Sequence, residues 1–305
     1  MNDHGGGNST ILPARVRCRQ LDGGALLIRA PAKINLNLLV GPRCGSGFHP
    51  VDSLVVKVTL YDDERLCPRT DGRITLTCSG ADCGPQERNL VMQATRLLAE
   101  GKDIDGVDIS LTKRIAPGSG LGGGSSDAAS LLWGLNRLWR LGFDAPGLGE
   151  LARRLGSDVP LFLGPPASRM TGRGERLATI AIHPFVAVVF VPGVACSTAE
   201  VYAAYDRRPA QTAGQLEPHV LANQPPSAWR GYLQNDLATA AGQVCPPLLA
   251  LRERLEAATD VPVCLTGSGS AMFFLCDDAA EAATVMAGLD GDLQARCVIV
   301  QPNPW

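Results

Sequence analysis

A glycine-rich segment near the middle of the chain constrains its folding more than any other feature. Residues 117–127 read Pro-Gly-Ser-Gly-Leu-Gly-Gly-Gly-Ser-Ser-Asp, which is too rich in glycine for a strand or a regular helix. A helix with an apolar face follows over 128–139, and Ser125, Ser126 and Asp127 suit its first positions. Glycine N–H groups and the positive end of a helix dipole together favour an anion. The segment therefore predicts a phosphate-binding loop rather than a linker.

Two common nucleotide-binding loops are excluded by what surrounds this segment. It does not end in the Gly-Lys-Ser/Thr sequence of a Walker loop. The flanking residues also lack the strand-helix-strand signature of a dinucleotide-binding unit. The segment is thus a phosphate loop of another kind.

The rest of the chain alternates strand-like and helix-like stretches, which predicts an α+β fold. Residues 33–38 alternate polar and apolar, placing Lys33, Asn35 and Asn37 on one strand face. A surface excursion is expected over the Pro/Gln/Ala-rich residues 211–229. We expect strands at 14–19, 26–40, 53–61, 74–78, 107–112, 185–191, 261–265, 271–276 and 296–301, a hairpin at 167–177, and helices at 90–100, 125–139, 148–155, 247–258 and 279–289.

Composition narrows the class of protein. With 305 residues, 45% hydrophobic and 19% charged, the chain can bury a core without disulfides. A net charge of −2 and the lack of a Lys/Arg block argue against a nucleic-acid partner. No stretch approaches the roughly 20 apolar residues that cross a bilayer. The polar, Gly-rich start lacks the features of a secretory signal, so we expect a cytoplasmic protein without a membrane partner.

The ten cysteines are scattered and form no C-x-x-C pair. Such a pair is the usual sequence signal of a zinc or redox site. We therefore expect reduced thiols, most of them buried, and the metal ligands of the protein remain unknown at this stage.

Three segments resemble, in order, the motifs of the GHMP kinases, a family that includes galactokinase, homoserine kinase and mevalonate kinase. They are Pro31-Ala32-Lys33-Ile34-Asn35, the glycine-rich loop, and Thr266-Gly267-Ser268-Gly269-Ser270. The resemblance implies ATP and Mg²⁺ as cofactors. It assigns nucleotide binding to Ala116, Pro117, Gly118, Ser119, Gly120, Leu121, Gly122, Gly123, Gly124, Ser125 and Ser126.

The same resemblance implies a two-lobed α+β fold with the active site in the cleft between the lobes. The N-terminal lobe is expected to be ribosomal protein S5 domain 2-like, and the C-terminal lobe ferredoxin-like. We predict a flexible extension over residues 1–26, an ATP-binding N-terminal domain over 27–180 and a C-terminal domain over 181–305.

Further blocks resemble the members of this family that phosphorylate a polyol linked to cytidine diphosphate. The resemblance covers nearly everything from Ala30 to Phe274. It implies transfer of the ATP γ-phosphoryl group to a hydroxyl of such a polyol, a step in non-mevalonate isoprenoid biosynthesis. The oligomeric state, monomer or weak homodimer, stays open. The blocks lie at 31–36, 47–49, 120–129, 155–160, 172–175, 197–202 and 235–237.

Lys33 and Asp158 are the candidate catalytic residues. Phosphoryl transfer to a hindered alcohol needs alignment, removal of a proton and control of charge. Asp158, set among Gly156, Val159 and Pro160, is the natural base. Lys33 can keep that carboxylate ionised and offset the charge of the transferring group. Taken singly, an exposed strand lysine and a turn-forming aspartate are the alternatives; both residues also match the catalytic pair of the family.

Several other residues are candidates for substrate binding. Asn35 shares the strand face of Lys33 and suits a hydrogen bond to the polyol. By resemblance, Phe48 stacks on cytosine and His49 reads its polar edge, which fits a flat base with a donor and acceptor rim. Tyr202 closes the stack from the other side by the same resemblance. Gly267 and Ser268 bring the backbone of the third motif close to the ligands, or else form only a tight connection between strands.

The chain departs from the family pattern in two loops. Ser46-Gly47-Phe48-His49 stands where Asp-Gly-Tyr-His is usual, and the preceding loop has one extra residue. Phe in place of Tyr keeps a stacking surface and loses a hydroxyl. Pro117 lies one position later than the usual proline, and Glu175 and Asp236 match family blocks without an evident chemical role.

Two other functions remain as alternatives from the sequence. One is another GHMP enzyme, such as a mevalonate, homoserine or phosphomevalonate kinase or a decarboxylase, against which Phe48-His49 and Ser157-Asp158-Val159-Pro160 argue. The other is a non-catalytic ligand-binding protein of the same fold, disfavoured because such a protein needs no lysine-carboxylate pair.

Overall fold

The computed structural model describes residues 17–45, 47–207 and 217–305, whose strands form two sheets. The large sheet has the order β1-β2-β4-β6-β5, with β3 and β7 also paired to β4 and β8 paired to β7. Every strand pair in it is antiparallel except β5 with β6. Its strands are β1 (Cys18–Gln20), β2 (Leu26–Asn35), β3 (Leu39–Val40), β4 (Val51–Arg69), β5 (Ile74–Gly80), β6 (Gly106–Lys113), β7 (Ala167–Gly172) and β8 (Arg176–Thr179).

Strand β4 is the central element of this sheet and is longer than predicted. It continues past Tyr61, where the predicted strand ends, because residues 63–69 pair with β6. Strand β2 pairs with β4 over the full length of β2, with a register shift between Pro31 and Ala32. One continuous strand thus carries the pairing of both halves of the sheet.

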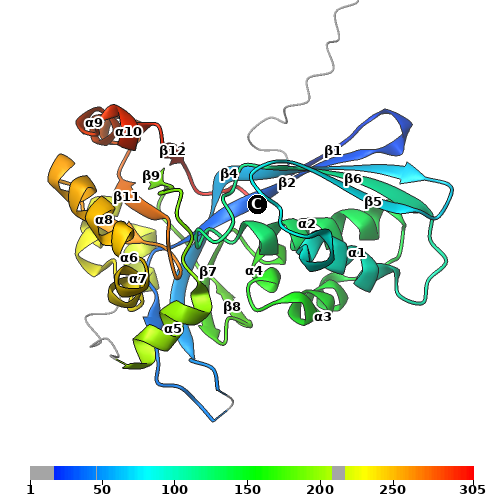
Figure 1. Cartoon of the computed structure of the whole chain (residues 1–305), viewed down its shortest axis with the longest axis horizontal. Coiled ribbons are helices and arrows are strands. Elements are labelled where there is room, and N and C mark those ends of the chain that lie inside the picture. Colours follow the sequence, from blue (N-terminus) through cyan, green and yellow to red (C-terminus); the bar gives the residue numbers. More distant parts are fainter. Residues whose placement is uncertain (1–16, 46, 208–216) are drawn as a thin grey trace, which may run out of the picture.

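Four helices cover one face of the large sheet (Figure 1). They bury their apolar sides against β2, β4 and β6 in a shared core that includes Ile28, Leu66, Leu131 and Phe162. The helices are α1 (Leu90–Ala99), α2 (Gly123–Leu138), α3 (Ala145–Leu155) and α4 (Val159–Leu163). Helix α2 begins two residues before the predicted Ser125, because Gly123 and Gly124 are already helical behind the left-handed Gly122.

The second sheet has the order β10-β11-β9-β12 and is antiparallel throughout. Helices pack on one of its faces, around Val188, Phe274 and Leu255. Its strands are β9 (Val186–Phe190), β10 (Val263–Leu265), β11 (Met272–Cys276) and β12 (Cys297–Val300). The helices of this half are α5 (Thr198–Arg207), α6 (Pro218–Asn223), α7 (Ala238–Val244), α8 (Pro246–Ala258), α9 (Ala279–Gly288) and α10 (Gly291–Gln294).

A middle core joins the two sheets. Ile34 and Val56 from the large sheet pack with Phe273 and Val189 from the small one. Trp229 belongs to the same core and is fully buried. The two halves therefore share apolar packing, and the α+β expectation is confirmed.

Three other expectations need correction. Residues 218–223 and 226–232 form α6 and a 3₁₀ helix whose Leu221 and Trp229 are buried, so this part of the expected excursion is core; residues 208–216 lie outside the described ranges. The extension predicted over 1–26 is wrong at its end, because Cys18–Gln20 pairs with β2; residues 1–16 are not described. All ten cysteines are free, but only Cys196 and Cys276 are buried.

Within the described ranges, no helix combines the length and apolar character needed to cross a membrane. The boundary predicted at residue 180 falls between β8 of the large sheet and β9 of the small one, and as a domain division it stays a prediction.

Candidate active site

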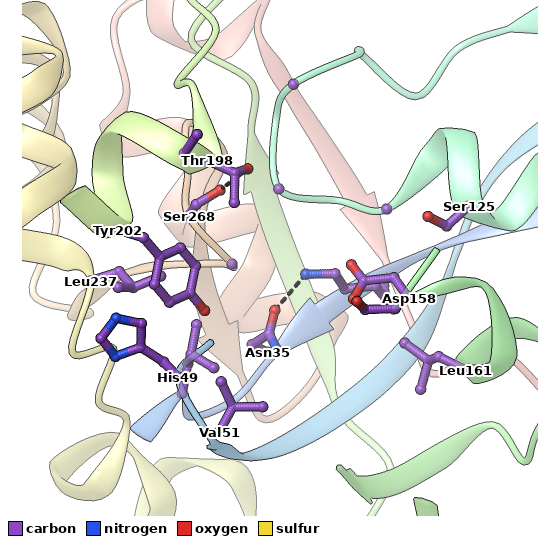
Figure 2. Close-up of a pocket in the computed structure, with 18 of the residues that line it drawn as sticks. Asn35, His49, Val51, Ser125, Asp158, Leu161, Thr198, Tyr202, Leu237 and Ser268 are labelled. Atoms are coloured by element: carbon purple, nitrogen blue, oxygen red, sulfur yellow. Dashed lines mark hydrogen bonds between the residues drawn. The ribbon is translucent and has the colours of Figure 1, made fainter. Parts of the chain in front are cut away.

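A cavity of about 760 Å³ lies where the glycine loops meet the ends of β2 and α5. Figure 2 shows Asn35, His49, Tyr202 and Asp158 converging on it from different elements. Almost all of the predicted site residues line it. They are Lys33, Asn35, Phe48, His49, Ala116, Pro117, Gly118, Ser119, Gly120, Gly122, Gly123, Gly124, Ser125, Asp158, Tyr202, Gly267 and Ser268.

Two predicted nucleotide-binding residues do not line the cavity. Leu121 and Ser126 are both completely buried. Leu121 packs into the middle core, and its backbone carbonyl accepts a hydrogen bond from the Lys33 N–H. Both side chains therefore support the loop from behind.

The first glycine loop depends on backbone conformations that favour glycine. Gly118, Gly120 and Gly122 all have φ between +66° and +78°. Gly122 ends the loop as the N-cap of α2, and no side chain caps the helix there. The first N–H groups of α2 thus have no side-chain acceptor, and anion binding there stays a prediction.

The third motif packs directly against this loop. A Cβ on Gly120 would lie 2.4 Å from the carbonyl oxygen of Thr266, and one on Gly267 would lie 3.0 Å from that of Gly120. Ser268 also exchanges a 2.8 Å hydrogen bond with Thr198, at the start of α5. The two loops and the α5 start thus form one continuous wall.

Lys33 lies between the two loops. It is buried, and a Cβ on Gly267 would come within 3.1 Å of its Nζ. Its ammonium group donates to Asn35 Oδ1 at 2.5 Å, the dashed line in Figure 2. Burial lowers the pKa of Lys33 to about 8, although the nearby charge of Asp158 raises it. Lys33 and Asp158 line the same cavity, and the charge of Asp158 acts on Lys33 across it.

Asp158 stands at the N-terminal end of α4 and is half-buried. Pro160 in the first turn fixes this start, because proline suits the first positions of a helix. The carboxylate does not cap its own helix. It lines the cavity instead, as Figure 2 shows, and remains available to a ligand.

Asn35 is held more firmly than the sequence suggested. Its Oδ1 accepts from Lys33 and its Nδ2 donates to Ser53 Oγ at 2.8 Å. Its backbone N–H donates to Thr266 Oγ1 at 2.9 Å. Asn35 therefore links β2, β4 and the third motif, and in this geometry it orients the ammonium group of Lys33.

At the other end of the cavity, His49 is fixed by the protein. Its Nδ1 donates to the carbonyl oxygen of Gly41 at 2.9 Å, and its Nε2 lies 2.9 Å from Asp206 Oδ1. The ring centroids of His49 and Tyr202 are 5.4 Å apart. His49 and Tyr202 are thus brought together, and both ring nitrogens of the imidazole already have partners in the protein.

Phe48 is half exposed, and a cation covers one face of its ring. The guanidinium carbon of Arg173 lies 3.7 Å from the ring centroid. Arg173 comes from the turn between β7 and β8, where its backbone N–H donates to Glu175 Oε2 at 2.6 Å. Glu175 therefore has a structural role in that turn.

Sequence reasoning missed Asp206, Arg173 and Thr198 as cavity residues. Asp206 lies four residues after Tyr202 in α5, hence on the same helix face. A helical pattern over 198–207 would have pointed to it, but no helix was predicted there.

Comparison with known proteins agrees with this geometry. The family pattern described as "GHMP kinases N terminal domain" matches residues 89–164, and "GHMP kinases C terminal" matches residues 220–292. A homoserine kinase from Cytophaga hutchinsonii, 16% identical, has a TM-score of 0.67 and covers 93% of this chain and 96% of its own. That likeness shows the fold.

Relatives of higher identity share one name. The 4-diphosphocytidyl-2-C-methyl-D-erythritol kinase of Mycolicibacterium gilvum is 37% identical over 92% of this chain and 91% of its own length. That of Pelotomaculum thermopropionicum is 36% identical over 85% and 91%. A solved 4-(cytidine 5'-diphospho)-2C-methyl-D-erythritol kinase is 34% identical, with a TM-score of 0.71 over 92% of this chain and 100% of that one. The chain belongs to the 4-diphosphocytidyl-2-C-methyl-D-erythritol kinase family of the GHMP kinases.

Proposed function

We propose that the protein transfers the γ-phosphoryl group of ATP to the 2-hydroxyl of 4-diphosphocytidyl-2-C-methyl-D-erythritol, giving the 2-phosphate and ADP. This is the kinase step of the methylerythritol phosphate route to isoprenoids, and we place it in the cytoplasm. The observation that carries the proposal is that Lys33 and Asp158 line the same cavity as the loop over residues 118–124, here called the glycine cradle. The names of relatives at 34–37% identity supply the substrate.

The chemistry needs a base and a fixed positive charge. As the 2-hydroxyl oxygen bonds to the γ-phosphorus, Asp158 accepts the hydroxyl proton and the bond from that phosphorus to the β,γ-bridging oxygen breaks. Lys33, protonated at neutral pH with a pKa of about 8, offsets the charge on the transferring group. Asn35 keeps the ammonium group in place.

The glycine cradle has the features that a nucleotide triphosphate needs. The uncapped N–H groups of α2 and the backbone of Gly118 to Gly124 face the cavity. A Cβ on Gly122 would fall 2.8 Å from Phe162, so the backbone is pressed close to the wall that supports it. The phosphates are therefore expected on this loop.

The residues present also fit a magnesium ion that the nucleotide brings. In the described ranges no three His, Cys, Asp or Glu side chains form a metal-binding group. Mg²⁺ in kinases is held by one or two protein oxygens together with phosphates and water. Ser125 lines the cavity at the start of α2 and would supply such an oxygen, which leaves Asp158 for the proton. When bound, the ion neutralises phosphate charge.

The cytidyl end is expected at Phe48, His49 and Tyr202. The half-exposed ring of Phe48 offers a stacking surface, and the fixed ring of His49 lies beside it. Tyr202, which belongs to α5, stands next to His49. An aromatic surface beside polar groups suits a pyrimidine base.

A phosphoryl-transfer assay tests this function. ATP with the cytidyl substrate should give ADP and the 2-phosphate, and unlinked methylerythritol should react much more slowly. Asp158→Ala should nearly abolish turnover and leave ATP affinity close to that of the wild type, while His49→Ala should mainly raise KM for the cytidyl substrate. Equal rates with and without the cytidyl group, or unchanged kcat in Asp158→Ala, would contradict the assignment.

A further inference from the structure

Helix α4 connects the proposed base to the phosphate loop. Asp158 stands at its start, and the ring of Phe162 lies against Gly122 at the end of the loop. With only five residues, Val159 to Leu163, the helix has little hydrogen bonding of its own. Its position therefore depends on its packing in the core and on what holds its other end.

A buried lysine holds that end. Lys57 of β4 is 1% exposed, and its Nζ donates to the carbonyl oxygens of Gly164 at 2.6 Å and Phe162 at 3.3 Å. These carbonyls belong to the C-terminal end of α4, where helices lack internal partners. A lysine amine carries at least two N–H groups in either protonation state, enough for both carbonyls.

Packing alone does not account for a lysine at this position. Among the residues described, no carboxylate forms an ion pair with Lys57. Burial lowers its pKa to about 7, and the neighbouring charge of Arg17 lowers it too. An apolar side chain would avoid this desolvation cost in a core position. What Lys57 adds is the pair of hydrogen bonds to the end of α4.

The sheet register links Lys57 to the catalytic machinery. Lys57 lies directly opposite Lys33 in the β2-β4 pairing, and opposite residues of an antiparallel pair project from the same face. Lys33 reaches toward Asp158 at the start of α4, and Lys57 bonds the carbonyls at its end. Neighbouring positions on one sheet thus face the two ends of the helix, and Lys57 bonds one of them.

We propose that Lys57 is a positioning residue for phosphoryl transfer: its two hydrogen bonds to the end of α4 keep Asp158 in line with the acceptor hydroxyl. The proposal rests on the function proposed above. Lys57 touches neither substrate nor nucleotide, since it lies outside the residues that line the cavity. Its loss should therefore change the rate of the chemical step more than the binding of either ligand.

Kinetics of three variants test this role. Lys57→Met keeps the apolar stem and removes the donor, and a displacement of about 1 Å in a reacting group lowers kcat by roughly 100-fold. We expect a fall of that order, with KM for ATP and for the cytidyl substrate within about threefold of wild type. Lys57→Gln keeps two N–H groups on a shorter chain and should lose less. Val285→Ala, buried in α9 away from the cavity, is the control for a lowered melting temperature.

Amide hydrogen exchange on the free proteins gives a second readout that needs no substrate. In Lys57→Met, exchange should speed up over residues 158–164 and stay unchanged over α9. Wild-type kcat in Lys57→Met, equal losses in kcat and both affinities, or unchanged exchange over 158–164 would each overturn the positioning role. Should Lys57→Met not fold, a fall of kcat in Lys57→Gln with unchanged exchange over 158–164, or faster exchange there with wild-type kcat, would overturn it. A wild-type protein that does not phosphorylate the cytidyl substrate refutes the proposed function instead, and exchange then decides the role of Lys57.

Discussion

Lys33 works in a buried position that brings its titration close to physiological pH. Burial lowers its pKa to about 8, and the charge of Asp158 keeps it from falling further. A neutral amine cannot offset the charge of the transferring phosphoryl group. We therefore expect kcat/KM, which reports the groups of the free enzyme, to fall as the pH rises through about 8. A pH-rate profile at substrate concentrations below KM measures it.

Unfolding would not explain such a loss. An unfolded chain holds the lysine proton up to a pKa of about 10.5, so between about pH 8 and that value it binds more protons than the folded protein. On account of Lys33, the free energy of unfolding then rises with pH in this window. A flat pH-rate profile across pH 8, or one that follows a falling melting temperature, would contradict the role of Lys33.

The sequence predicted chemistry at single residues better than their contacts. Lys33 and Asp158 were identified because their side-chain types suit phosphoryl transfer and both match the catalytic pair of the family that the sequence resembles, and the structure brings them to one cavity. Asp206 was missed as a cavity residue because no helix was predicted over 198–207, and its contact with His49 joins α5 to a loop more than 150 residues earlier in the chain. A local pattern carries no record of such a contact.

At the scale of elements, the glycine loop is expected to tolerate a methyl group at one position and not at another. Gly120→Ala places a Cβ 2.4 Å from the Thr266 carbonyl oxygen at φ +78°. Gly124→Ala meets only a Leu90 methyl at 3.7 Å, with an ordinary φ. We expect Gly120→Ala to lower the free energy of unfolding by about 1–3 kcal/mol or more and to weaken ATP binding. Gly124→Ala should leave stability unchanged or slightly higher.

Thermal denaturation and ATP titration of both variants check this expectation. Equal melting temperatures for the two variants would show that the two glycine loops do not pack as closely as the contact of Gly120 with Thr266 implies.

Helices and strands with a strong periodicity in the sequence were predicted, and those whose extent depends on tertiary contacts were missed. The helix over 128–138 and the apolar strand near 186–190 are present. Strand β4 is longer than the predicted strand because it continues through Asp62 and Glu64, which are buried. Two acidic residues in sequence gave no sign of a buried strand. Lys113 bridges Asp62 to Asp127, and this ion pairing lets acidic residues occupy the interior. A surface excursion was predicted over 211–229, yet Trp229 anchors the described part of it in the middle core.

At the scale of the whole molecule, one carboxylate joins the two halves. Asp236 Oδ2 accepts from the Val40 N–H at 2.8 Å, and its own N–H donates to the Leu38 carbonyl at 2.9 Å. This contact gives a structural role to a family block for which the sequence offered no chemistry. Asp236→Ala leaves the buried Val40 N–H without its acceptor and should lower the free energy of unfolding by about 1–3 kcal/mol.

Calorimetry is the measurement for this variant. Because the middle core and the backbone hydrogen bonds of β4 to residues 301 and 303 connect the halves, we expect one cooperative transition in the wild type and in Asp236→Ala, at a lower temperature in the variant. Asp236→Asn keeps one acceptor oxygen and should lose less. Two separate transitions in the wild type would show that the halves unfold independently.

The arginine over Phe48 means that the stacking surface is already in use before a base arrives. If cytosine stacks on that face, the guanidinium of Arg173 must leave it. A free base that stacks there removes the aromatic partner of the guanidinium and offers no replacement. A base linked to a diphosphate also brings negatively charged oxygens, to which the guanidinium can bind. Discrimination between a free nucleoside and its diphosphate conjugate would then arise from an exchange of partners, in which only the conjugate compensates for what it displaces.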